Sequence, residues 1–179
     1  MKIGLQRGTV IVEDHKTEWE EDAKQTIESL RKILQSVAID IQHVGSTAIK
    51  NICAKPIIDI AVGVLNLDEM LSLNDVLEEN GFIFRGQVIP DELLYVCGEN
   101  DFRTHHIHIT VYDSEEWNNY LNMRDYLNCH EEDAHAYSEL KKRLAEQYPD
   151  DRGTYTSMKS EMITEILYKA NLWRTQPDD

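Results

Sequence analysis

The carboxylate of Asp59 is the first candidate for chemistry in this chain, because it stands in the middle of the apolar run Ile57 to Val64. Burying an unpaired carboxylate is costly, so Asp59 needs a cation, a network of hydrogen-bond donors or contact with solvent. The ordinary alternative is an Asp that faces the surface of a half-exposed strand or caps a nearby turn. If the run is a strand, alternate side chains share a face, so Asp59 and Ala61 point together.

Paired histidines are the second candidate. In the stretch Thr104 to Tyr112, a period of two places His106 and His108 on one face and His105 on the other, with the apolar residues. Asp and His together suit Zn²⁺, Mn²⁺ or Fe²⁺ better than Mg²⁺, which prefers oxygen ligands. If the two strands are neighbours, Asp59, His106 and His108 could converge on one metal ion. The alternative is that both histidines are partly exposed and hydrogen-bonded to their neighbours.

A third candidate is a set of residues that could hold phosphate. Gly45, Ser46 and Thr47 form a small-residue turn between two predicted strands. The same residues also suit a plain sharp turn, since Gly allows left-handed backbone and Ser caps helical turns. Lys55 lies four residues before the acid, and Arg103 precedes the histidine strand and could offer a planar fork to a phosphate. These five residues are the candidate phosphate ligands.

The string HVGSTAIKNICAKPIIDIAVGV, from His43 to Val64, resembles the signature of the nucleotidyltransferase superfamily and of the GrpB family in particular. The resemblance continues through RTHHIHI, EEWNNYLNMRDYL and LKKRLAEQYPDDRGTYTSMKSEMI and covers almost the whole chain. It implies an α+β fold, with a nucleotidyltransferase-like mixed β-sheet, flanking helices and a C-terminal helical cap. In that superfamily the Gly-Ser turn holds nucleotide phosphate, and the following strand supplies metal-binding acids spaced Asp-x-Asp or Asp-x-Glu.

Ala61 departs from this pattern, because it stands where an active nucleotidyltransferase carries its second acid. Two-metal phosphoryl chemistry needs carboxylates that hold ions about 4 Å apart, and Ala61 offers no ligand. Two functions stay open. One is an enzyme that binds a nucleotide or other phosphorylated small ligand, with Asp59 as its catalytic residue, a divalent metal (Mg, Mn or Zn) and metal-dependent nucleotidyl transfer. The other is a catalytically degenerate fold that acts as a ligand-binding or interaction module.

The amino-acid composition limits the kinds of molecule that this protein could bind. The chain has 179 residues, with 33 Asp and Glu against 18 Lys and Arg and a formal charge of −15. Such a field repels phosphate backbones, so long nucleic acid is excluded, while a local positive pocket for a small ligand is not. Three cysteines without a Cys-x-x-Cys pattern fit a reducing compartment. No apolar run reaches the length of a signal peptide or membrane span, so we expect a cytoplasmic protein without a membrane partner.

The elements that must position these residues follow from periodicity. Apolar residues at steps of three and four predict an amphipathic helix from Lys16 to Val37. Asn66, and Asp113 with Glu116, predict helix starts. Strands are predicted at 8–13, 39–44, 57–64, 82–84, 88–89, 93–97 and 104–112, and further helices at 66–81, 113–128, 131–148 and 152–173. We therefore expect a single domain over 1–179, with a sheet portion over about 1–112 and a helical portion over about 113–173.

Overall fold

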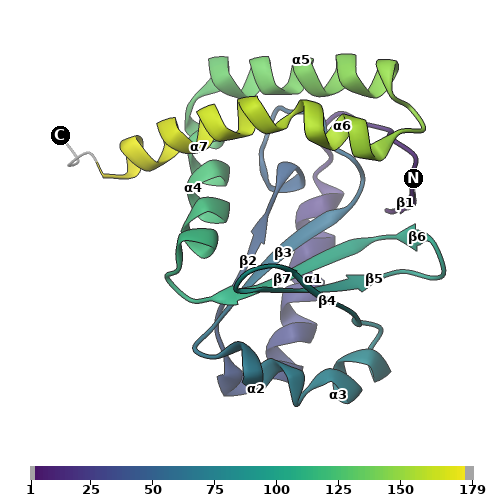
Figure 1. Cartoon of the computed structure of the whole chain (residues 1–179), viewed down its shortest axis with the longest axis vertical. Coiled ribbons are helices and arrows are strands. Elements are labelled where there is room, and N and C mark those ends of the chain that lie inside the picture. The colour runs from purple at the N-terminus through teal and green to yellow at the C-terminus, as the bar shows by residue number, and fades with distance from the viewer. Residues whose placement is uncertain (1–2, 176–179) are drawn as a thin grey trace.

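The computed structural model describes residues 3–175 and shows a mixed β-sheet with helices on both faces (Figure 1). Its elements are β1 (Leu5–Gln6), α1 (Glu18–Leu34), β2 (Ala38–Val44), β3 (Ile58–Val64), α2 (Leu67–Leu71), α3 (Asn74–Glu79), β4 (Ile83–Ile89), β5 (Glu92–Cys97), β6 (Phe102–Arg103), β7 (His105–Val111), α4 (Glu115–Cys129), α5 (Glu131–Gln147), α6 (Arg152–Met158) and α7 (Ser160–Arg174). The expected α+β fold is confirmed. Among the described residues, no helix is both long enough and apolar enough to cross a membrane.

Strand register decides which side chains meet. The five-stranded sheet has the order β2-β3-β7-β5-β4, and β1 pairs with β6 in a separate two-stranded sheet. β3 and β7 run parallel, whereas the other neighbouring pairs in the five-stranded sheet are antiparallel. The parallel register sets Asp59 opposite His106 and Ala61 opposite His108. These four residues therefore share one face of the sheet, as the period of two predicted.

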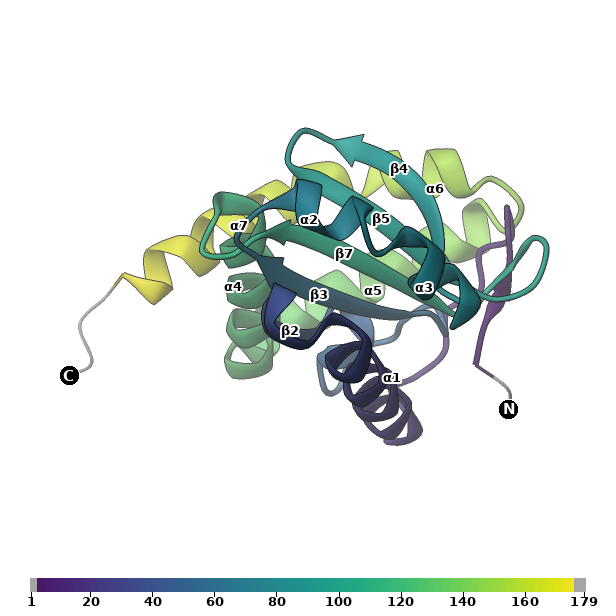
Figure 2. The ribbon, with the colours of Figure 1, turned by 90° about the horizontal axis from the view of Figure 1, so that it is seen from below.

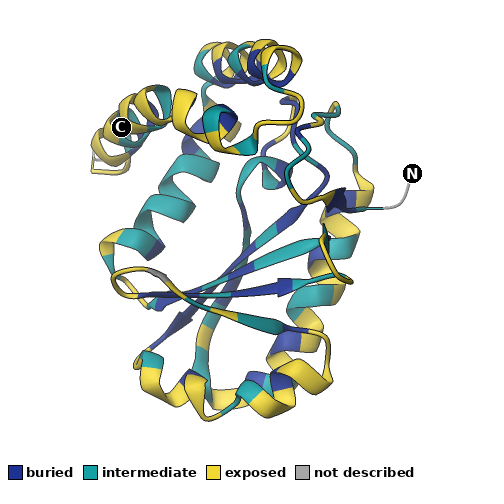
Figure 3. Ribbon diagram, turned by 45° about the vertical axis from the view of Figure 1, so that its right-hand side comes forward, coloured by how far each residue is buried: buried dark blue, intermediate teal, exposed yellow. Residues whose placement is uncertain are grey.

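The two faces of the sheet are covered differently. α1, α2 and α3 pack against one face, where Ile58, Ile60 and Ile107 form the main hydrophobic core with Trp19 and Leu30 of α1. α4 contacts the opposite face, and α5, α6 and α7 lie beyond it (Figures 1 and 2). Figure 3 shows buried residues along the central strands and exposed residues on the outer sides of the helices. The face of the sheet that carries His106 and His108 is thus covered by α4 to α7.

The strand predicted at 8–13 is wrong. Within it only Glu13 forms a β-bridge, with Ala54, and the first strand is the shorter β1. The segment is instead fastened by packing: Val10 is buried beside Tyr155 and its backbone N–H donates to Pro149. An apolar run can be buried under helices without a partner strand, and periodicity does not separate these cases.

Two helix starts were predicted from capping residues. Asn66 accepts a hydrogen bond from the Asp68 backbone at 2.8 Å, so the first prediction is confirmed. The second is wrong by one residue, because Asp113 has a positive φ of 61° and Ser114 is the cap. Its hydroxyl accepts from the Trp117 backbone at 3.2 Å. Both residue types cap helices, so the side-chain geometry decided between them.

Two predicted helices are each divided. The helix predicted at 66–81 is α2 followed by α3, and the one predicted at 152–173 is α6 followed by α7. Between α6 and α7, Lys159 is the junction residue, and the Ser160 hydroxyl donates to the Ser157 carbonyl at 2.7 Å. The break lets Lys159 line the cavity described below.

Candidate functional site

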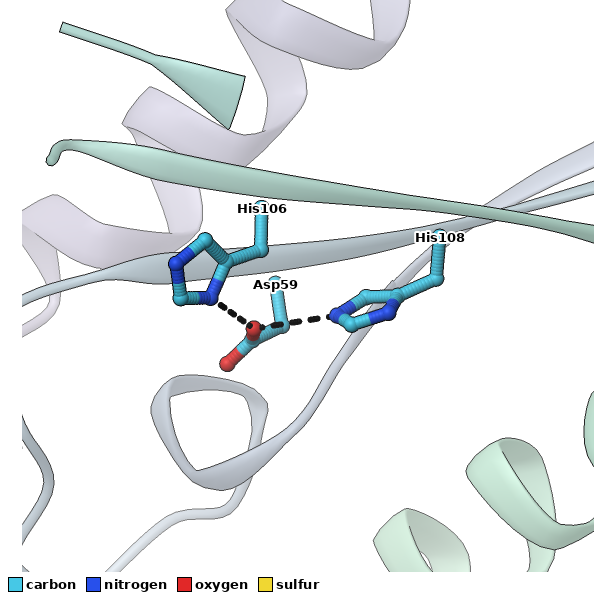
Figure 4. Close-up of side chains that lie close together, drawn as sticks. All are labelled: Asp59, His106 and His108. Atoms are coloured by element: carbon cyan, nitrogen blue, oxygen red, sulfur yellow. Dashed lines mark hydrogen bonds and ion pairs between the residues drawn. The ribbon is translucent and has the colours of Figure 1, made fainter. Parts of the chain in front are cut away.

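Asp59, His106 and His108 converge on the enclosed face of the sheet. Asp59 Oδ1 lies 3.2 Å from His106 Nδ1 and 3.3 Å from His108 Nε2 (Figure 4). One ligand atom from each residue lies within 4.8 Å of the other two. All three side chains are partly buried, with 27%, 15% and 16% of their surface exposed. The structure thus brings together the three residues that the sequence proposed as metal ligands.

The negative charge of Asp59 and the positive charge of His108 stabilise each other. Burial opposes ionisation of Asp59, but hydrogen bonds and charge from the two histidines hold the pKa of its carboxyl well below its usual range. Burial likewise opposes protonation of His108, but hydrogen bonds to Asp59 and Glu92 raise the pKa of its imidazole to about 9. Asp59 is therefore an anion at neutral pH, as an ion-pair partner or a metal ligand must be.

Glu92 is a site residue that the sequence analysis missed. It opens β5, is only 3% exposed, and its Oε1 lies 2.9 Å from His108 Nδ1. The Tyr120 hydroxyl of α4 donates to the other oxygen, Oε2, at 2.9 Å. The predicted strand began one residue later, at Leu93. Extending its period of two backward places Glu92 on the face of Leu94, which is paired with His108, and would have revealed it.

The Gly45-Ser46 turn lies directly against Asp59. Gly45 has a φ of 69°, and a Cβ built there would lie 2.6 Å from Asp59 Oδ2. Only glycine therefore fits this turn. Ser46 lines the same cavity as Asp59. Thr47 does not: it is 1% exposed, and its hydroxyl lies 2.9 Å from Nε2 of His43.

A cavity of about 550 Å³ separates the sheet from α4 to α7. Its sheet side carries Asp59, His106, His108, Glu92 and the Gly45-Ser46 turn. Its helix side is formed by residues of α4, α5, α6 and α7, including several aromatic and basic side chains. This volume is in the range that proteins use for small-molecule ligands.

Basic residues also line the cavity, both from the helices and from the segment that precedes β3. Lys55, Lys159 and Arg152 all line it, and the Lys55 and Lys159 amines lie 5.5 Å and 4.4 Å from the centre of the Tyr155 ring. Lys141 of α5 is 2% exposed; its amine donates to the Cys53 carbonyl. The sequence analysis named Lys55 among the candidate phosphate ligands. Lys141 and Arg152 lie on helices whose basic residues gave no signal distinguishable from ordinary surface charge.

The pKa values of the three lysines that line the cavity are lowered, so their charged forms are disfavoured. Burial lowers the pKa of Lys141 to about 7, with repulsion from Lys159 and Lys55 acting in the same direction. Burial and Arg152 lower the pKa of Lys55 to about 8. Burial and Lys55 lower that of Lys159 to about 8. A bound anion would offset the repulsion and favour the charged amines.

Arg103 does not reach the cavity. It belongs to β6, which pairs with β1 outside the main sheet, and it is 7% exposed. Its Nη1 donates to the Asn100 carbonyl at 2.5 Å, so the guanidinium fastens the turn before β7. Arg124 does line the cavity, but its Nε donates to Asp125 of its own helix at 2.7 Å.

Comparison with known proteins identifies relatives across nearly the whole chain. The family model described as GrpB protein matches residues 9–169. The glutamate-rich protein GrpB of Alkalihalophilus pseudofirmus is 38% identical over 170 residues, covering 92% of this chain and 98% of the relative. A crystal structure of the conserved protein GrpB from Enterococcus faecalis superposes with a TM-score of 0.85 at 32% identity, covering 91% of this chain and 99% of that one.

A more distant likeness concerns the fold alone. The Cid1 poly(U) polymerase, in a crystal structure described as having MgGTP bound, superposes with a TM-score of 0.53 at 15% sequence identity. The match covers 74% of this chain and 44% of the polymerase. The α+β architecture of this chain is therefore nucleotidyltransferase-like.

The donor set does not fit the paired magnesium ions of two-metal phosphoryl transfer. Such ions need several carboxylate oxygens, whereas the triad offers one carboxylate and two imidazoles. Ala61, opposite His108, is fully buried and has no ligand atom. Glu92 is already engaged by His108 and Tyr120.

Proposed function

The chain belongs to the GrpB family, and we propose that it binds a nucleotide or another phosphorylated small ligand in the cavity between its nucleotidyltransferase-like sheet and α4 to α7. One observation carries the proposal. A protein with a formal charge of −15 gathers Lys55, Lys141, Lys159 and Arg152 around a single cavity. Collecting repelling, partly desolvated cations has an electrostatic cost that an anionic ligand would offset.

The Gly45-Ser46 turn supports phosphate as the anion. Ser46 faces the cavity beside the acidic strand, and its hydroxyl would donate to a phosphate oxygen. Lys55 lines the same cavity and would contribute charge. Thr47 and Arg103 are left out of this proposal, because the structure places neither in the cavity wall.

A divalent metal at Asp59, His106 and His108 is the second part of the proposal. When bound, such an ion would place positive charge beside the phosphate and so shield Asp59 from it. Asp59 is the candidate catalytic residue if the protein turns its ligand over. Ala61 favours the alternative, a catalytically degenerate fold that binds without transfer.

The proposed partner is a small molecule, because the overall negative charge opposes binding of long nucleic acid. The three cysteines are free thiols in the structure. This agrees with the proposed cytoplasmic location, where thiols stay reduced.

The test is ligand-dependent stabilisation of the purified chain. Melting temperature is measured with ATP, GTP, CoA and pyrophosphate, each in chelator and each with added divalent metal. At least one of these ligands is expected to raise the melting temperature, because a ligand that binds only the folded state stabilises it. Release of pyrophosphate or nucleoside monophosphate in the same samples separates turnover from binding.

Variants locate the binding site. Replacing Lys55 and Lys159 together by Met is expected to weaken that ligand at least tenfold. The exposed residue Lys142, replaced by Met, is the matched control on α5 and leaves affinity unchanged. No stabilisation of the wild type by any of the four ligands, or equal affinity in the double variant, would contradict the proposal.

A further inference from the structure

We infer that Asp59, His106 and His108 bind one divalent transition-metal ion that accepts imidazole nitrogen, rather than the paired magnesium ions of two-metal nucleotidyl transfer. The inference deepens the proposed function, because the ion would occupy the wall of the same cavity. It rests on the spacing of three ligand atoms, on their chemistry and on the residue that holds His108.

The spacing of the ligand atoms matches that of a coordination shell. With metal–ligand bonds of about 2.1 Å, neighbouring donors lie about 3.0 Å apart in an octahedral site and about 3.4 Å apart in a tetrahedral one. Asp59 Oδ1 lies 3.2 Å from His106 Nδ1 and 3.3 Å from His108 Nε2. The two imidazole nitrogens lie within 4.8 Å of each other. The three atoms therefore lie close enough together for one ion to bind them.

The donor types select the class of metal. Two imidazoles and one carboxylate suit Zn²⁺, Fe²⁺, Co²⁺ and Mn²⁺, whereas Mg²⁺ prefers a shell of oxygen atoms. Ala61 is the next residue of β3 on the same face as Asp59 and is fully buried in a cluster with Trp117, so β3 supplies a single acid on this face. The site is therefore built for one ion. The cavity on its open side leaves room for water or a phosphate oxygen to complete the shell.

Glu92 gives His108 the orientation of a metal ligand. The buried Glu92 carboxylate accepts the Tyr120 O–H at 2.9 Å and lies 2.9 Å from His108 Nδ1, which donates its N–H to it. The other nitrogen, Nε2, then points at Asp59 Oδ1. A divalent ion would take the place of the proton between this nitrogen and the carboxylate, bound by the lone pair of the neutral imidazole. A carboxylate behind a metal-bound histidine is a recurrent second-layer arrangement.

Metal binding is measured on the full chain without any phosphorylated ligand. Protein stripped with chelator is titrated by calorimetry with Zn²⁺, Co²⁺, Mn²⁺ and Mg²⁺ separately, and bound metal is counted by elemental analysis after dialysis. We expect one Zn²⁺ or Co²⁺ per chain, visible absorption bands from bound Co²⁺, and affinity for Mg²⁺ at least 100-fold weaker. Two ions per chain, or Mg²⁺ bound as tightly as Zn²⁺, would overturn the inference.

Variants assign the ion to the triad. Asp59→Asn and His108→Ala are expected to abolish tight binding, and Glu92→Gln to weaken it 10- to 100-fold, a typical loss for a supporting residue. His105→Ala is the matched control, because His105 lies on the same strand but faces the opposite side of the sheet. There its Nε2 lies 3.1 Å from the hydroxyl of Thr26 in α1. Circular dichroism confirms folding of each variant, and Glu92→Gln preserves side-chain shape.

The outcomes separate this inference from the proposed function. Zn²⁺ binding that survives both Asp59→Asn and His108→Ala would place the ion elsewhere and refute the triad. If Zn²⁺ binds at the triad while no nucleotide, CoA or pyrophosphate stabilises the protein, this inference stands and the proposed ligand fails. If those ligands bind in chelator and no metal binds, the ligand-binding part of the proposed function stands, whereas its metal part and this inference both fail.

Discussion

Gly45 and Asp59 are packed so closely that no side chain fits between them. A Cβ on Gly45 would lie 2.6 Å from Asp59 Oδ2 and 2.9 Å from Asp59 Cβ, and the backbone φ of 69° independently disfavours other residues. The turn and the acid therefore hold each other in place. Through His106 and His108, the same contact extends to the neighbouring strand.

Gly45→Ala is expected to destabilise the fold and disturb the site together. Positive φ alone costs about 1 to 2 kcal/mol in a non-glycine residue. The clash with Asp59 adds about 1 to 3 kcal/mol, because the turn or the carboxylate must move. Urea unfolding measures the loss. Gly8→Ala is the control: its φ is 94° but nothing lies within 4 Å of the added methyl. Equal losses in the two variants would show that the Asp59 contact is unimportant.

Ser46→Ala is expected to weaken the phosphorylated ligand by roughly tenfold, because one hydrogen bond to a charged group is worth about 1.5 kcal/mol or more. Zn²⁺ affinity should not change, since Ser46 is outside the triad. Thr47→Val is the neighbouring comparison. It removes the hydroxyl beside His43 and is expected to cost about 1 kcal/mol of stability without affecting the ligand. Ligand affinity that falls only in the Thr47 variant would reverse the assignment.

Lys141→Met is expected to change how stability depends on pH. Lys141 has a pKa of about 7 in the folded chain against an ordinary value of 10.5. Between these values the unfolded state holds the extra proton, so wild-type stability gains up to about 1.4 kcal/mol per pH unit from this group as pH rises. The contribution is complete above pH 10.5 and is lost as pH falls towards 7.

Urea unfolding from pH 6.5 to 9.5 compares wild type with Lys141→Met. The variant should lack the part of the positive slope that Lys141 contributes, and the difference between the two proteins removes the contribution of the groups that do not interact with Lys141. Lys142→Met on the exposed side of α5 is the control and keeps the wild-type slope. Parallel curves for wild type and Lys141→Met would show that Lys141 stays charged throughout.

Arg103→Met is expected to reduce stability by about 1 kcal/mol, because the carbonyl of Asn100, in an exposed turn, loses the hydrogen bond donated by the buried Arg103 side chain. Affinity for the phosphorylated ligand should stay within twofold of wild type. Chemical unfolding and ligand titration together measure the two effects. A large loss of ligand affinity without a loss of stability would show that Arg103 contributes to ligand binding.

Local patterns predicted the faces of the strands well. The alternation around Asp59 and around His106 and His108 was enough to place each side chain on its face. Their position in adjacent strands could not be read from these patterns, because β3 and β7 are separated in sequence by α2, α3, β4, β5 and β6. The resemblance to the GrpB family implied a mixed sheet, but whether these two strands are neighbours in it was left open. Parallel pairing then brought the residues opposite each other.

The positions of Arg103, Lys141 and Arg152 relative to the cavity could not be predicted from local sequence patterns. Arg103 adjoins the histidine strand in sequence, but β6 pairs with β1 and carries it away from the cavity. Lys141 and Arg152 entered the site through packing of α5 and α6 above the sheet, which no spacing in their own helices indicates. Glu92 was missed for a smaller reason, a strand boundary misplaced by one residue.

The cavity wall divides its chemistry between different stretches of chain. Strands supply the carboxylates and imidazoles, whereas the segment after residue 130 supplies Lys141, Arg152 and Lys159. A chimera that exchanges only that segment would change the basic residues contributed by α5, α6 and α7 and keep Lys55, the Gly45-Ser46 turn and the three proposed metal ligands. Part of the anion recognition can thus be varied while the proposed metal site is kept.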